Sequence, residues 1–227
     1  MKVYEFNLNQ SLLDKFFIPV RDRAMVIEIL MESIKLMLLN PTIKATDIKG
    51  KIFLKVEKMS RLFFFQKDKY FSIVFPFFVS KDNEKFKFYS NLARNIDSEL
   101  ISQVLSVIRN SKFKSKSYYD FFNSFDSPDS SDDHYSNYNN TFWDFLGNLF
   151  ITEDGYVRYD YDKANYKKSR IKGEKHNHPE YHCDIFYSNK STFKIGFKRK
   201  IQTTDFVDLL NITTGCKYLI NATDKLS

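Results

Sequence analysis

The segment RLFFFQKDKYFSIVFPFFV (residues 61–79) sets the architecture of the chain. Two aromatic runs flank the polar corner Lys67-Asp68. Phe, Ile and Val favour strands, and a polar corner between two such runs predicts an antiparallel hairpin. Another apolar run at 51–59 comes before it. We therefore expect an antiparallel meander of three strands, in which 70–79 is a single strand, with a fourth strand at 86–89.

Consecutive phenylalanines constrain how this sheet is covered. Successive side chains of a strand point to opposite faces, so adjacent Phe residues require an apolar cover on both faces. The cover is either helices of this chain or a partner, which includes another copy of the chain. The side chains concerned are Phe63, Phe64, Phe65, Phe75, Phe77 and Phe78.

The remaining periodicities predict an α+β protein. Apolar residues at helical spacing predict helices at 21–39, 97–110, 141–150 and 203–214. Asp22 is the expected N-cap of the first helix, Asp97 or Ser98 that of the second, and Thr141 that of the third. Alternating segments predict strands at 156–161, 181–187 and 193–197. The fold class is thus an antiparallel Phe-rich sheet with packed helices and a C-terminal β-rich unit.

A segment of different composition separates two parts of the chain. Residues 123–140 contain four Asp and no Lys or Arg, with many Ser, Asn and Tyr, and are expected to form an exposed, mobile acidic loop. The organisation that follows is a helix-plus-sheet unit at 1–122, this loop, and an α+β unit at 141–227. One continuous domain is the alternative.

Composition excludes several classes of protein. The 227 residues carry a formal net charge of +7, and only 6 are glycine, with no two close together. A dinucleotide fingerprint or a P-loop needs clustered glycines, so both are excluded. No apolar run approaches the ~20 residues of a membrane span, and no signal peptide is evident. With two distant cysteines, the chain is expected to be cytoplasmic, without a membrane contact.

Basic residues are concentrated in the C-terminal third. One group lies at 163–175 and another at 194–200, with tyrosines between them. This pattern suits a phosphate backbone with stacked bases, and a solvated lysine-rich surface is the alternative. The residues nominated for nucleic-acid contact are Lys163, Lys167, Lys168, Arg170, Lys172, Lys198, Arg199 and Lys200.

Three of the four histidines lie within seven residues, in the segment EKHNHPEYHCD (174–184). Pro179 should open a strand there, and the strand around 155–162 also alternates polar and apolar residues. If these strands pair antiparallel, their polar faces meet on a shared, solvent-facing surface. The side chains gathered there would be Arg158, Asp160, His182 and Asp184.

Such a patch could cleave a phosphodiester without a metal. A carboxylate beside an imidazole fixes its tautomer and raises its basicity, so Asp184 or Asp160 would make His182 a general base. Arg158 would bind the phosphate and stabilise developing charge. Two other interpretations remain open: an ion-pair network that holds two strands together, or a divalent metal at His176, His178 and His182, with Asp184 as an oxygen ligand.

Three stretches carry a resemblance to known proteins: GYVRYDYD (155–162), HPEYHCDI (178–185) and STFKIG (191–196). They resemble the patterns G-Y-x-R-x-D, H-P-x-x-H-x-D and S-x-F-K-I-G of a bacterial family catalogued as a domain of unknown function. More remotely, the order Arg-x-Asp then His-Pro…His is similar to small toxins encoded beside an antitoxin. The resemblance implies a bacterial, cytoplasmic protein of a defence or mobile-element neighbourhood. The toxin likeness implies RNA cleavage by Arg158, Asp160, His178 and His182.

Two functional hypotheses follow. The first is a nucleic-acid-directed protein of a bacterial antiphage-defence or toxin system, with metal-independent RNA cleavage by the Arg/Asp/His patch and no cofactor. The second is a non-catalytic subunit that docks a larger defence ATPase or nuclease through its aromatic sheet.

Overall fold

The computed structural model describes residues 2–57, 59–83, 85–110, 138–174, 177–188, 191–211 and 213–215. The expected acidic loop at 123–140 lies almost entirely outside these residues. The strands are β1 (Lys2–Leu8), β2 (Gly50–Val56), β3 (Arg61–Gln66), β4 (Lys69–Val74), β5 (Phe78–Asp82), β6 (Lys85–Tyr89), β7 (Val157–Tyr161), β8 (Tyr181–Ser188) and β9 (Ser191–Phe197). The helices are α1 (Gln10–Phe16), α2 (Arg23–Leu39), the 3-10 helix η1 (Ala45–Asp47), α3 (Ser98–Arg109), α6 (Asn140–Ile151), α7 (Lys163–Ile171) and α8 (Thr203–Leu209).

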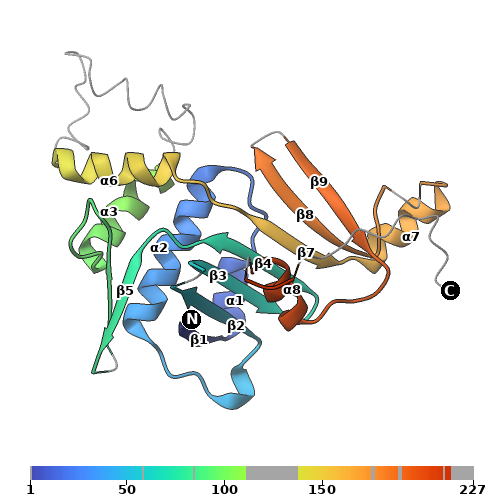
Figure 1. The fold of residues 1–227 in the computed structure, drawn as a ribbon, viewed down its shortest axis with the longest axis horizontal. Helices are drawn as coiled ribbons and strands as arrows, with labels where there is room; N and C mark the ends of the chain where they lie inside the picture. The colour runs from blue at the N-terminus through green and yellow to red at the C-terminus, as the bar shows by residue number, and fades with distance from the viewer. Residues whose placement is uncertain are drawn as a thin grey trace, which may run out of the picture.

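The protein is α+β, as predicted, and is built on one long sheet (Figure 1). Its strands follow in the spatial order β1-β2-β3-β4-β7-β8-β9, and all neighbours are antiparallel. A separate two-stranded sheet is formed by β5 and β6. Because β4 pairs directly with β7, strands from both sides of the acidic segment share one sheet. The described ranges include no helix with the length and apolar character that a membrane crossing requires.

The three consecutive phenylalanines of β3 point to both faces of the sheet, as alternation requires. Phe64 lies in the larger core, where it contacts Phe16 of α1 and where α2, α3 and α6 also bury their apolar sides. Phe63 and Phe65 lie on the opposite face, where Phe206 of α8 contacts both rings. Helices of the same chain therefore cover both faces at β3.

This packing leaves no exposed Phe-rich face on β3 and β4 for a partner. Of the six side chains nominated for an interface, only Phe78 is exposed, at 53%. The other five are buried: Phe63, Phe64, Phe65, Phe75 and Phe77. Docking of a larger protein through these five side chains is thus not supported by the described part of the chain.

Several element boundaries differ from the prediction. The run at 70–79 is not one strand: β4 ends at Val74, and Phe78 begins β5 in the smaller sheet. Pro76 lies between them and has no N–H for a central strand. The helix expected at 203–214 ends at Leu209.

Helix caps explain where the other helices begin. The predicted caps of α2 and α3 are confirmed, because Asp22 accepts a hydrogen bond from the backbone N–H of Met25 and Asp97 accepts one from Leu100. The α6 helix begins one residue earlier than predicted. Its cap is Asn139, which accepts from the backbone N–H of Phe142, and not Thr141.

Helix α7 was missed by the sequence argument, which placed no helix between 150 and 203. Asp162 caps it by accepting a hydrogen bond from the backbone N–H of Asn165. None of its residues is buried, so it has no apolar stripe. Apolar periodicity cannot reveal a helix without such a stripe.

Candidate functional site

The predicted antiparallel pairing of the two C-terminal strands is confirmed. In the register of β7 and β8, Arg158 lies opposite Asp184 and Asp160 lies opposite His182. On the other side of β8, Lys194 of β9 lies opposite Asp184. Side chains from four sheet positions are thus brought together as predicted, and we call Arg158, Asp160, His182 and Asp184 the polar cluster.

The polar cluster is buried, which corrects the expected solvent-facing surface. Asp160, His182 and Asp184 are 8%, 1% and 3% exposed. The segment before β8 folds over the sheet, since a Cβ placed on Gly196 would lie 2.9 Å from the Pro179 ring. Alternation placed the side chains on the correct face but could not show this cover.

Cations neutralise both carboxylates of the polar cluster. Arg158 donates from Nε to Asp160 Oδ2 and from Nη2 to Asp184 Oδ2, each at 2.6 Å. Lys194 Nζ donates to Asp184 Oδ1 at 2.5 Å, and Lys69 Nζ lies 3.6 Å from Asp160 Oδ1. The network connects β4, β7, β8 and β9.

The ion pairs determine the charge of Asp184. Burial alone would raise the pKa of its carboxyl group, but the hydrogen bond and charge of Lys194, together with the charge of Arg158, outweigh burial and hold that pKa below its usual value. Asp184 is therefore ionised at neutral pH. The two carboxylates in turn raise the pKa of Arg158 despite its burial.

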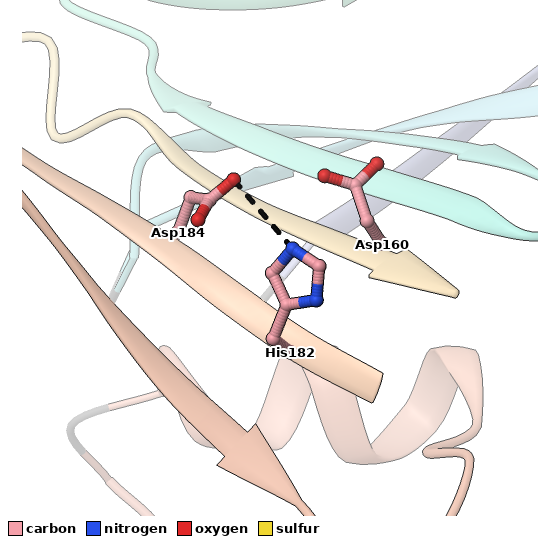
Figure 2. A group of neighbouring side chains, drawn as sticks. All are labelled: Asp160, His182 and Asp184. Atoms are coloured by element: carbon pink, nitrogen blue, oxygen red, sulfur yellow. Dashed lines mark ion pairs between the residues drawn. The ribbon is translucent and has the colours of Figure 1, made fainter. Parts of the chain in front are cut away.

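His182 is held neutral and in one tautomer. Its Nδ1 lies 2.8 Å from the carbonyl oxygen of Pro179. Because a carbonyl only accepts, Nδ1 carries the proton and Nε2 the lone pair. Burial and the charge of Lys194 lower the pKa of His182. Figure 2 shows the ring directed between the two carboxylates, with Nε2 3.9 Å from Asp184 Oδ2.

Three side chains of the polar cluster have the composition of a metal site. Ligand atoms of Asp160, His182 and Asp184 lie within 4.8 Å of one another. A divalent ion there would have to displace Arg158, which contacts both carboxylates, and would add charge beside Lys194. The donor set fits an ion-pair network better than a metal centre.

Of the metal ligands expected from the sequence, His176 lies outside the described residues.

His178 does not join the polar cluster through hydrogen bonds. Its Nε2 lies 3.1 Å from Asp162 Oδ2, and its ring packs edge-to-face on His182 with centroids 4.8 Å apart. Asp162 ends the alternating segment 155–162 of the sequence argument, but it was not nominated for the site. The signal that could have found it is its position at the end of the same alternating strand, beside the loop that carries the histidines.

The eight nominated basic residues lie at one end of the sheet. Tyr161 at the end of β7 is opposite Tyr181 at the start of β8, which is opposite Phe197 at the end of β9. Helix α7 and the segment 198–200 therefore begin at neighbouring strand ends, and Figure 1 shows α7 far from β5, α3 and α6. We call this region the basic end, formed by Lys163, Lys167, Lys168, Arg170, Lys172, Lys198, Arg199 and Lys200.

No family model, curated protein or solved structure matches this chain.

Proposed function

We propose that the protein binds nucleic acid through the basic end. The observation that carries the proposal is the convergence of α7 and the segment 198–200 at neighbouring strand ends, which gathers the eight cations in one region. A nucleic-acid backbone carries one negative charge per phosphate, and its counterions are released when such cations replace them.

The cations of α7 are available for a ligand. The four cations of the helix and Lys172 at its C-cap are all exposed, and within the described ranges none of the five has an ion-pair partner. Two of the nearby acids are already engaged, because Asp162 contacts His178 and Asp68 contacts Lys200. Helix α7 therefore presents unneutralised positive charge to solvent, at a position where no apolar packing explains its composition.

Aromatic side chains lie beside these charges. The rings of Tyr161 and Tyr181 stack with centroids 4.9 Å apart, and Lys200 Nζ lies 5.5 Å from the centre of the Tyr161 ring. Both tyrosines are only partly buried. Partly exposed rings among cations are typical of surfaces that bind single-stranded nucleic acid.

The proposal is binding, without cleavage by the polar cluster. His182, the general base nominated from the sequence, is 1% exposed, and Arg158 is engaged with two carboxylates. A substrate at the surface would not reach His182 Nε2 in this conformation. The polar cluster instead connects the strands that position α7 and the segment 198–200.

Fluorescence anisotropy with a labelled 20-nucleotide RNA of mixed sequence tests the proposal. We expect affinity to fall with salt, with a log–log slope of about −0.7 per contacted phosphate for a single strand. The double substitution Lys167→Glu, Lys168→Glu should weaken binding at least ~10-fold at low salt, since it reverses two contacts.

A control with the same change of charge is available elsewhere. Lys85 and Lys87 are exposed on β6, which lies outside the basic end. The substitution Lys85→Glu, Lys87→Glu should leave the affinity within about 2-fold, because these charges lie beyond a Debye length of ~10 Å from the bound RNA. Equal losses in both variants would show only a response to net charge and would overturn the proposal.

A further inference from the structure

We infer that His178 and Asp162 form a catalytic site that cleaves RNA held at the basic end, with His178 as the general base. This inference rests on the proposed nucleic-acid binding and adds a reaction to it. The geometry moves the catalytic base from His182, where the sequence placed it, to a neighbouring histidine with a different carboxylate.

Asp162 is fixed at the start of α7 by two hydrogen bonds from one residue. The backbone N–H of Asn165 donates to Oδ1 at 3.0 Å, and its side-chain amide donates to Oδ2 at 2.6 Å. Burial alone would raise the pKa of Asp162, but the bonds from Asn165 and His178 outweigh it and lower that pKa. The carboxylate is therefore ionised and can only accept a hydrogen bond.

This acceptor sets the tautomer of His178. Since Asp162 Oδ2 lies 3.1 Å from Nε2, that nitrogen carries the proton and donates it, and Nδ1 keeps the lone pair. In the described part of the chain, Nδ1 has no hydrogen-bond partner. An oriented imidazole with a free lone pair is the arrangement of a general base.

Exposure separates this pair from the polar cluster. The side chains of His178 and Asp162 are 22% and 28% exposed, against 1% for His182. Lys163 follows Asp162 directly in the chain and begins the row of basic-end cations. A phosphate bound by α7 would therefore lie beside the one described histidine that solvent reaches.

His182 acts as a positioning residue for His178. Its ring packs edge-to-face on the His178 ring, and its Nδ1–H holds the carbonyl of the next residue, Pro179, at 2.8 Å. The loop that carries His178 is thus fixed to β8. A positioning role is consistent with the buried, neutral state of His182, whereas direct catalysis by His182 is not.

The reaction that these groups support is attack by the ribose 2′-hydroxyl on the adjacent phosphorus. His178 Nδ1 takes the proton of the 2′-hydroxyl as the O2′–P bond forms and the P–O5′ bond breaks. Water gives a proton to the leaving O5′, and His178 later returns its proton to water. The products are a 2′,3′-cyclic phosphate and a 5′-hydroxyl, so the substrate must be RNA.

Incubation of the full chain with labelled RNA in EDTA tests the inference. The substrates are a 20-nucleotide single strand, an RNA hairpin and the all-deoxy version of the single strand. We expect cleavage of RNA to cyclic-phosphate ends and none of DNA. His178→Ala and His178→Gln should each lower the rate at least ~100-fold, the typical contribution of a general base, at an unchanged melting temperature.

Asp162→Asn tests whether Asp162 orients the His178 ring for catalysis or only supports the fold. It should lower the rate less than the His178 variants do, because the imidazole stays in place but loses the carboxylate that fixes its tautomer. The melting temperature should stay unchanged, because Asn caps a helix as well as Asp does. Asp82→Asn, at an exposed carboxylate of β5, is the matched control and should change neither quantity.

The outcomes distinguish the two proposals. RNA that binds with the expected salt dependence but stays intact overturns the catalytic site and leaves nucleic-acid binding in place. Cleavage that persists in both His178 variants, or that cuts DNA equally, also overturns it. Absence of binding to every probe overturns the proposed function together with the inference.

Discussion

Two parts of the same sheet use strand alternation in different ways. In β3 both sets of side chains are apolar, so Phe64 enters one core and Phe63 enters the other. In β8 one set is largely apolar and the other includes buried polar side chains: Cys183 enters a core, whereas Asp184 is buried among cations. Burial on a sheet face is thus achieved by helices in the first part and by ion pairing in the second.

The difference has an energetic consequence. Apolar burial stabilises in proportion to area and depends little on pH, whereas a buried ion pair gains little net stability and is costly only when one partner is lost. We therefore expect the β3 part to determine the overall stability and the β7–β9 part to determine its response to charge and pH.

The largest effect should come from the apolar part. Phe64→Ala removes a fully buried ring and leaves a cavity, so it should lower the free energy of unfolding by about 3–5 kcal/mol. Phe193→Ala on β9, where the ring is 50% exposed, should change it by less than about 0.5 kcal/mol. Urea unfolding measures both, and equal losses would contradict the division between the two parts.

The polar part should respond to the loss of one charge. Asp184→Asn leaves Arg158 and Lys194 without their shared carboxylate and should cost about 2 kcal/mol, less than a fully buried pair because both cations are partly exposed. Asp82→Asn, at an exposed carboxylate, is the control. A loss no larger than that of the control would show that the network is not coupled to folding.

A smaller effect on the free energy of unfolding is expected at acidic pH. His182 has a lowered pKa in the folded chain, so below pH ~6.5 the unfolded chain binds a proton that the folded chain does not. The contribution of neutral His182 to the free energy of unfolding is full above that pH. It is lost as the pH falls toward the pKa of His182 in the folded chain, by at most about 1.4 kcal/mol per pH unit. The stability gap between wild type and His182→Asn should therefore shrink from pH 7 to pH 5. A constant gap in thermal unfolding would contradict this.

The sequence anticipated the register of β7 and β8 because strand alternation is a local rule. Arg158 and Asp160 share one face of their strand, and His182 and Asp184 share one face of theirs, so antiparallel pairing with these faces on the same side of the sheet brings all four together. It could not anticipate their burial, which depends on the fold of the residues before β8 over Gly196. Solvent exposure is a property of the whole arrangement and not of a strand's own pattern.

The contact between His178 and Asp162 shows the same limit. Asp162 is sixteen residues away from His178 along the chain, across a helix that has no apolar stripe to predict it. The two meet where the pairing of β7 with β8 continues past the strand ends, since the backbone N–H of Asp162 donates to the carbonyl oxygen of Glu180 at 2.9 Å. By contrast, the basic residues were found from composition alone, because charge needs no partner to be recognised.

The sharpest check compares two charge reversals with one RNA. If the basic end binds the backbone, the dissociation constant of Lys167→Glu, Lys168→Glu should exceed that of Lys85→Glu, Lys87→Glu at least ~5-fold at low salt, and the ratio should approach one as salt is raised. A ratio of one at every salt concentration would contradict the assignment of the basic end as the nucleic-acid interface.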